Sequence, residues 1–150
     1  MVLGWNNIYC GIETSPGLSP GNYISAFKGK MFIGDYTQIG PNVSIHTVNH
    51  SLTDNRLFVA KNVNIGKYCW LGNQSIILPG VTLGDYTIVA AGSIVTKSFL
   101  EGYCVIAGNP AKVIKVINSD DCVFHKSTYE YNGYIKNEYF NDYREQNLNI

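Results

Sequence analysis

The sequence has few charged residues and no excess of either sign. Charged side chains make up 15% of the 150 residues, and 11 basic residues balance 11 acidic ones. A chain without net charge lacks the positive field with which proteins attract nucleic acid or an anionic membrane. We therefore expect small-molecule or protein partners, with no nucleic acid and no membrane insertion.

Cysteine spacings typical of metal and redox sites are missing too. The four cysteines are widely spread, and none belongs to a C-x-x-C pair. We therefore expect buried free thiols and no metal. The segment Met1–Gly11 lacks the basic start and apolar run of a signal peptide, and no run of about 18 apolar residues follows. These absences predict a soluble cytoplasmic protein, and the length predicts one domain.

A repeat of six residues is the strongest signal in the chain. An α-helix places its apolar residues about 3.6 apart, and an alternating strand has a period of two. A period of six suits short strands joined by tight corners, in which Gly, Asn and Asp supply positive φ angles. The repeated aliphatic positions form two series with one break: Ile33, Ile39 and Ile45, then Ile65, Leu71, Ile77, Leu83, Val89 and Val95.

The neighbours of these positions repeat as well. The next residue is glycine at positions 34, 40, 66, 72 and 84, and the fourth residue on is small or β-branched. With units such as IGDYTQ and LGDYTI, the chain resembles the hexapeptide-repeat acyltransferases over residues 12–117. The resemblance implies an all-β fold, a left-handed parallel β-helix with three six-residue sides per coil. The left hand rests on the resemblance alone, because general rules for crossovers favour the right hand.

The repeat also divides the chain. We expect an irregular first coil at 12–32, the β-helix at 33–117 and a C-terminal extension at 118–150 with a short helix near 134–145. The break between the two series predicts a loop extruded near 50–62. A short solenoid exposes its ends and sides, and the family forms trimers. We therefore expect a homotrimer with active sites between subunits.

His50 ends the segment IHTVNH at the repeat break and is the predicted catalytic residue. The segment resembles the place where sugar O-acetyltransferases of the family hold their catalytic histidine. An alcohol must lose a proton as it attacks a thioester, and imidazole is the natural general base at neutral pH. Two orienting partners stay open, the side chain of Asp54 and a backbone carbonyl.

The resemblance implies acetyl-CoA as the acyl donor. In the galactoside and maltose acetyltransferase branch, the cofactor lies in the groove between two prisms. Small residues there let the pantetheine arm approach the backbone, and lysines meet the phosphates. The chain's terminal signature, VAAGSIVTK followed by AGNPAKVIK, resembles that of the family. The expected cofactor residues are Trp70, Gly72, Asn73, Ala90, Ala91, Thr96, Lys97, Lys112 and Lys115.

On the acceptor side we expect Asn22, Tyr23, His46 and Asn49. Asn22 is the nearest match to an asparagine that binds the acceptor in the simple-sugar branch, and Tyr23 is suited to stack on a sugar ring. His46 either lines the site or pairs across a subunit boundary. Asn49 either donates to the acyl carbonyl or is a corner residue. The region around Asn22 departs from the simple-sugar enzymes and resembles acetyltransferases of capsule or lipopolysaccharide synthesis.

Several functions stay open at this point. The leading one is acetyl transfer to a hydroxyl of a sugar or polysaccharide precursor. An amino-sugar N-acetyltransferase needs nearly the same residues, and a non-catalytic β-helix scaffold needs only the repeat. A γ-type carbonic anhydrase requires three zinc-binding histidines, and His46, His50 and His125 lack the pattern. His125 is expected to be a surface or packing residue.

Overall fold

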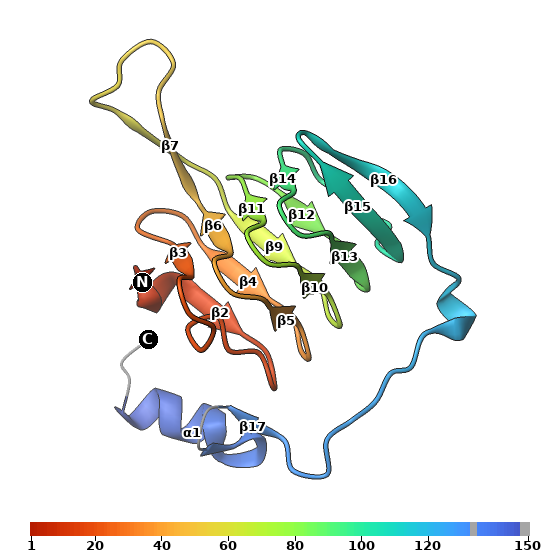
Figure 1. The fold of residues 1–150 in the computed structure, drawn as a ribbon. Coiled ribbons are helices and arrows are strands. Elements are labelled where there is room, and N and C mark those ends of the chain that lie inside the picture. The colour runs from red at the N-terminus through yellow and green to blue at the C-terminus, as the bar shows by residue number, and fades with distance from the viewer. Residues whose placement is uncertain (133–134, 148–150) are drawn as a thin grey trace.

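The body of the protein is a parallel β-helix with three sheets (Figure 1). The computed structural model describes residues 1–132 and 135–147. The first sheet contains β1 (Val2–Leu3), β3 (Tyr23–Ser25), β6 (Ser44–His46), β11 (Ile76–Ile77) and β14 (Ile94–Val95). The second contains β5 (Gln38–Ile39), β10 (Trp70–Leu71), β13 (Thr87–Val89), β15 (Cys104–Gly108) and β16 (Ala111–Val116). The third contains β2 (Ile8–Cys10), β4 (Met31–Ile33), β9 (Val63–Ile65) and β12 (Thr82–Leu83).

Successive coils stack in the register that the repeat predicts. Ile65 pairs with Leu83 and Leu71 with Val89, each across a parallel ladder. All nine repeated aliphatic residues are buried, and the most exposed of them, Ile39, keeps only 9% of its surface accessible. The small or β-branched residues of the repeat are buried beside them. The core is therefore a column of aliphatic side chains along the axis of the helix.

The glycines that follow the aliphatic positions serve coil stacking. The positive φ angles expected of corner Gly and Asn residues occur at Asn42, Gly80 and Gly92. A Cβ atom on Gly72 would lie 2.6 Å from the carbonyl oxygen of Val89 in the next coil. Any larger residue would push the coils apart. Two residues after these glycines, the φ angle is positive at Tyr36, Asn42, Tyr68, Gln74 and Tyr86.

The β-helix begins before the expected boundary of 12, and its last strand ends at Val116, next to the expected boundary of 117. At the start, β1 and β2 already pair in parallel with β3 and β4, so the first coil includes residues before 12. At the other end, β16 returns antiparallel to β15, and β15 is the last strand of the parallel ladder. The helix therefore closes in a hairpin.

The expected loop is present as a second hairpin. Strands β7 (Val48–His50) and β8 (Phe58–Ala60) pair antiparallel and stand out from the corner between the first and third sheets (Figure 1). Between β6 and β9 the chain leaves the helix, and it re-enters at β9, which pairs in parallel with β4 and begins the next coil.

Four tyrosines at positive φ form a stacked column along the corner between the third and second sheets. The ring centroids of Tyr36, Tyr68, Tyr86 and Tyr103 are 5.1, 5.1 and 5.7 Å apart in that order. We call this set the tyrosine column. It gives the outer surface of the helix a continuous aromatic edge, to which the rest of the chain attaches.

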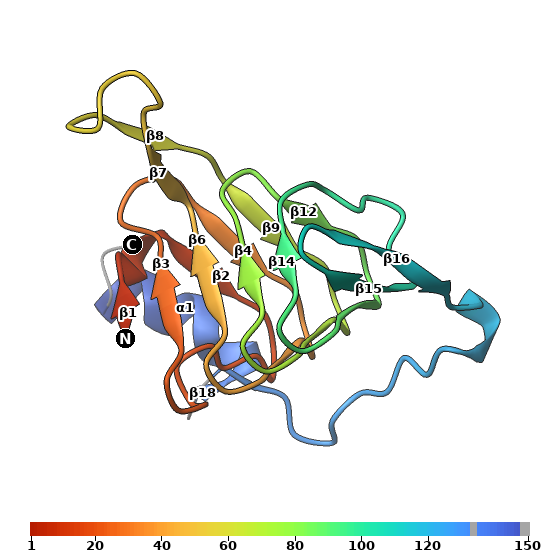
Figure 2. The same ribbon diagram turned by 45° about the horizontal axis from the view of Figure 1, so that its top comes forward.

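The C-terminal extension follows the tyrosine column from the last coil back to the first (Figure 2). It contains the 3-10 turn Ser119–Asp121, β17 (Tyr131–Asn132), β18 (Ile135–Lys136) and α1 (Asn137–Asn147); a second 3-10 turn, Trp5–Asn7, precedes β2. The hydroxyl of Tyr68 donates to the carbonyl of His125, and the hydroxyl of Tyr86 donates to that of Val123. The predicted start of the helix at 134 lies outside the described residues. Among those described, no helix has the length and apolar character to cross a bilayer.

Candidate active site

A cleft of about 220 Å³ lies between the β7–β8 hairpin and the first sheet. It contains the predicted base, His50, together with three of the four predicted acceptor residues, Tyr23, His46 and Asn49. Its remaining lining residues are Leu3, Ser25, Phe27, Val48 and Phe58. Strand β3, strand β6 and the hairpin thus bring together residues that are distant in the sequence.

His50 has a hydrogen-bond partner that defines its tautomer. Its Nδ1 atom lies 2.5 Å from the backbone carbonyl oxygen of Asn55, across the hairpin. A carbonyl can only accept a hydrogen bond, so Nδ1 carries the proton and Nε2 keeps its lone pair. This is the tautomer that a general base requires. The ring also packs against Phe58 with a centroid distance of 4.7 Å.

Asp54, the other partner considered for His50, is engaged elsewhere. Its carboxylate accepts hydrogen bonds of 2.9 Å from both Nε and Nη2 of Arg56. These bonds hold the pKa of Asp54 below its usual value. The pair shapes the end of the hairpin, and the backbone carbonyl of Asn55 takes the orienting position.

His46 sits deeper in the cleft than His50. Its side chain is half-buried, and its ring centroid lies 5.4 Å from that of Tyr23. Burial lowers the pKa of His46, which favours the neutral imidazole. His46 can therefore donate one hydrogen bond and accept another at neutral pH.

Two phenylalanines that the sequence analysis missed complete the cleft. Phe27 and Phe58 meet edge to face with a centroid distance of 6.1 Å, and they keep 57% and 46% of their surfaces exposed. The ammonium of Lys28 lies 5.4 Å from the centre of the Phe58 ring. Phe58 could have been predicted from the sequence, because it is an aromatic residue in RLFVAKN, the end of the loop extruded from the repeat.

Asn22 does not belong to the cleft, which corrects its predicted role. Its side chain is buried, donates to the carbonyl of Pro16 and accepts from the backbone N–H of Val43. Tyr23 pairs with Ser44, so Asn22 occupies the inward corner position that Val43 takes in the next coil. Asn22 therefore closes a coil.

The predicted cofactor residues lie at separate places on the prism. Trp70 is exposed on the second sheet, and Asn73, Ala90 and Ala91 follow at the corner toward the first sheet. Thr96 and Lys97 are exposed after β14, at the corner toward the third sheet, and Lys112 and Lys115 are exposed on β16. Gly72 is the exception: it is buried, and the next coil fills the space beside it. Its predicted contact with the cofactor is therefore wrong.

His125 lies outside the cleft, and a metal site would require it to lie near other ligand side chains. His125 packs edge to face against Tyr36 and Tyr68, as expected of a packing residue. Within residues 1–132 and 135–147, no group of three or more His, Cys, Asp or Glu side chains is arranged to hold a metal ion.

Three-sided coils, a six-residue repeat and an extruded hairpin that carries a histidine define a hexapeptide-repeat protein. Residues 62–97 match the family described as bacterial transferase hexapeptide (six repeats). The chain is 38% identical over 116 residues to a galactoside O-acetyltransferase of Escherichia coli (strain K12), covering 75% of this chain and 50% of the relative. It is 34% identical over 110 residues to a putative colanic acid biosynthesis acetyltransferase of the same strain, covering 59% of this chain and 60% of the relative.

Solved structures show the same likeness. A maltose O-acetyltransferase from Clostridium difficile 630 superimposes with a TM-score of 0.65 at 32% identity, covering 79% of this chain and 64% of the other. A galactoside acetyltransferase in complex with coenzyme A gives a TM-score of 0.64 at 27% identity, covering 87% of this chain and 66% of the other. The chain spans about half the length of the first curated relatives. The chain thus contains the bacterial transferase hexapeptide repeat over residues 62–97 and is similar over most of its length to hexapeptide-repeat acetyltransferases.

Proposed function

We propose that this protein is an acetyl-CoA-dependent O-acetyltransferase that acts on a hydroxyl of a sugar or polysaccharide precursor, with His50 as the general base. One observation carries the proposal: the Asn55 carbonyl holds Nδ1 of His50 and leaves Nε2 as a proton acceptor within a cleft. Relatives named as galactoside, maltose and colanic acid acetyltransferases support the choice of acceptor. Similar solved structures in complex with acetyl-CoA or coenzyme A support acetyl-CoA as the acyl donor.

The proposed reaction needs one base and two positioned substrates. As the acceptor hydroxyl attacks the thioester carbonyl, its proton passes to Nε2 of His50. The tetrahedral intermediate then expels the thiolate of CoA, which takes that proton from the imidazolium. An acetyl ester and free CoA thiol result, and His50 returns to its starting state. Holding both substrates in one cleft supplies much of the remaining acceleration.

The cleft offers an apolar wall and polar groups to a sugar ring. The rings of Tyr23, Phe27 and Phe58 present faces for stacking. The amide of Asn49 and the neutral imidazole of His46 provide donors and acceptors for hydroxyl groups. Because His46 stays neutral at pH 7, it can donate a hydrogen bond to a sugar hydroxyl or accept one from it, without attracting anions.

The cofactor site is proposed to form between subunits of a homotrimer of left-handed prisms. Asn73, Ala90 and Ala91 lie at one corner of the prism, and Thr96 and Lys97 lie at another. A closed trimer places unlike corners of neighbouring copies against each other. Lys97, with Lys112 and Lys115, then supplies positive charge for the phosphates. The cytoplasmic location expected from the sequence stays a prediction.

Calorimetric titration with acetyl-CoA tests the donor site. We expect one site per chain, weakened in the variant Lys97→Gln. Lys67→Gln is the matched control, because Lys67 is held by Asp35 at 2.8 Å on the corner of the tyrosine column. Absence of binding by the unmodified protein contradicts the proposal and favours a scaffold. Equal affinity of both variants and the wild type shows that Lys97 takes no part.

An acceptor panel then tests the reaction type. CoA release is measured with matched pairs of sugars that differ only by a hydroxyl or an amino group at one carbon. We expect turnover with hydroxyl acceptors. Turnover restricted to the amino sugars contradicts O-acetylation and favours an N-acetyltransferase.

A further inference from the structure

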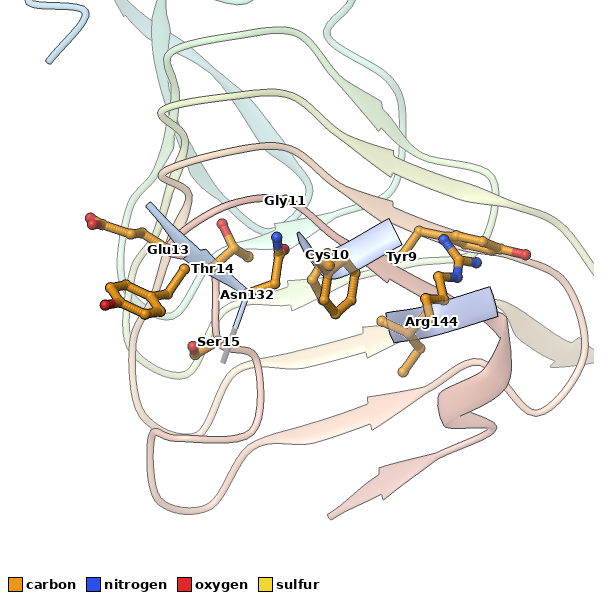
Figure 3. A pocket seen from close by; sticks show the side chains of 11 residues that line it. Tyr9, Cys10, Gly11, Glu13, Thr14, Ser15, Asn132 and Arg144 are labelled. Atoms are coloured by element: carbon orange, nitrogen blue, oxygen red, sulfur yellow. The ribbon is translucent and has the colours of Figure 1, made fainter. Parts of the chain in front are cut away.

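A large cavity lies at the first-coil end of the β-helix, under the C-terminal extension. It has a volume of about 570 Å³ and shares no lining residue with the cleft around His50. One wall is β2 with the following corner, and the other is formed by β17 and α1 (Figure 3). The cavity is in the range of small-molecule sites, which measure about 300–1,000 Å³. Its lining residues are Ile8, Tyr9, Cys10, Gly11, Glu13, Thr14, Ser15, Tyr131, Asn132, Phe140 and Arg144.

The cavity exists because the first coil breaks the pattern of the others. Glu13 holds the positive φ of this corner, 52°, where the following coil has Tyr36 and later coils have Tyr68 and Tyr86. The tyrosine column therefore ends at Tyr36, whose hydroxyl donates to Glu130 at 2.8 Å and accepts from the backbone N–H of Ser127 at 3.1 Å. Directly afterwards the extension leaves the column and closes over the first coil.

Arg144 gives one end of the cavity an unmatched positive charge. Its guanidinium carbon lies 5.1 Å from the centre of the Tyr9 ring, and its side chain is half-buried. Among residues 1–132 and 135–147, no acidic side chain forms an ion pair with it. An arginine stacked on an aromatic ring keeps the N–H groups of its plane free to bind a carboxylate with two hydrogen bonds.

The other end of the cavity carries a negative charge. Figure 3 shows Glu13 and Arg144 at opposite ends, with Cys10, Thr14 and Asn132 between them. Glu13 accepts hydrogen bonds and repels anions, while Asn132 and Ser15 both donate and accept. The site therefore suits an elongated ligand with one carboxylate at the Arg144 end and neutral hydroxyl groups along the rest. A polyanion such as a polyphosphate would meet the charge of Glu13.

We propose that this cavity binds a short acidic saccharide. Its carboxylate pairs with Arg144, its hydroxyls bind Asn132, Ser15 and Glu13, and its apolar ring faces contact Tyr131 and Phe140. Binding here needs neither acetyl-CoA nor His50, so the proposal is independent of the proposed catalytic function. In a protein that acts on an acidic glycan, the site would hold a part of the polymer away from the reacting unit.

Binding of cellobiouronate, a disaccharide of one glucuronate and one neutral glucose unit, to the whole protein tests the proposal. It is measured by calorimetry and by saturation-transfer NMR without acetyl-CoA. We expect binding of cellobiouronate, at least about tenfold weaker binding of the neutral disaccharide maltose, and none of tripolyphosphate. Failure of cellobiouronate to bind overturns the proposal. Equal binding of maltose, or tighter binding of tripolyphosphate, overturns it as well.

Variants locate the binding to this cavity. We expect Arg144→Gln to weaken cellobiouronate binding by about tenfold or more, and Arg144→Lys to give an intermediate loss, because lysine keeps the charge without the planar pair of donors. Arg56→Gln is the matched control: the same substitution on the β7–β8 hairpin should leave affinity unchanged. Wild-type affinity in both Arg144 variants overturns the proposal, and the lysine variant answers the question alone if the glutamine variant does not fold.

Discussion

His46 and His50 share one cleft, yet their surroundings differ. His46 lies between β3 and the hairpin, where burial lowers its pKa, while His50 is exposed on β7 and held by a backbone carbonyl. The two side chains therefore suit different tasks. In the proposed reaction, His46 serves as a neutral hydrogen-bonding group for the acceptor, and His50 exchanges the proton.

The lowered pKa of His46 has a consequence for stability. In the unfolded chain, histidine titrates near pH 6.5, so below that pH the unfolded state takes up a proton that folded His46 resists. The contribution of neutral His46 to stability is present above about pH 6.5 and is lost as the pH falls through the folded pKa. We expect thermal unfolding midpoints to fall more steeply from about pH 7 to about pH 5 in the wild type than in His46→Gln. Parallel slopes would contradict this reading of His46.

The hydroxyl of Ser75 tests how much a buried hydrogen bond contributes to the stability of the β-helix. Ser75 is fully buried, and its hydroxyl oxygen has no hydrogen-bond partner among the described residues. Ser93, the next residue in the same column, accepts from the backbone N–H of Gly108 at 3.2 Å. We expect Ser75→Ala to leave the free energy of unfolding unchanged or to raise it, and Ser93→Ala to lower it by about 1 kcal/mol. Urea unfolding of the two variants measures the difference, and equal losses would be the contrary result.

At the level of the coil, glycine has two separate uses. A Cβ on Gly84 would lie 2.3 Å from the carbonyl oxygen of Leu100, whereas Gly92 has φ +70° and nothing within 4 Å of its Cβ position. We expect Gly84→Ala to lower the free energy of unfolding by about 1–3 kcal/mol. Gly92→Asn should cost less than about 1 kcal/mol, because asparagine tolerates the left-handed region. Denaturant titration of both variants measures the two free energies of unfolding. A larger loss for Gly92→Asn than for Gly84→Ala would contradict these two roles of glycine.

The sequence was informative about the elements and less so about their corners. The six-residue interval predicted the buried positions because inward-facing residues at equivalent places must all be aliphatic. It also placed the extruded hairpin, since a break in the period forces the chain out of the coil. The positive φ of Tyr36, Tyr68 and Tyr86 had no comparable signal, because tyrosine rarely adopts it and stacking between coils imposes it here. The prediction for Asn22 was wrong for a related reason. From the sequence alone, an asparagine buried at a corner cannot be distinguished from one that binds a ligand.

At the scale of the whole molecule, the C-terminal extension runs from the last coil to the first. Its path depends on the hydroxyls of the tyrosine column and on Phe124, which packs edge to face on Tyr68 and Tyr86. Residues 118–150 have no period, so their path could not be read from the sequence. The cleft residues Phe27 and Phe58 were missed for the same reason, since non-repeated segments bring them together.

The extension also shields Cys10. This thiol lines the large cavity, and burial raises its pKa to about 11. In a chain that ends after Ile117, one wall of the cavity is gone, and we expect Cys10 to react with a thiol reagent at least about tenfold faster near pH 8. Cys69, whose burial in the core raises its pKa to about 12, is the internal control and should stay slow. Peptide mass spectrometry reads each thiol separately, and an unchanged rate at Cys10 would show that the coil alone buries it.

The most direct test of proton transfer to His50 compares the wild type with His50→Ala. CoA release is followed under saturating acetyl-CoA with a sugar acceptor found to be active, and acetyl-CoA affinity is measured by calorimetry on the same preparations. We predict a fall in kcat of about 10²- to 10⁴-fold, with acetyl-CoA affinity within about twofold of the wild type. A variant that keeps wild-type turnover would contradict the assignment of His50 as the general base.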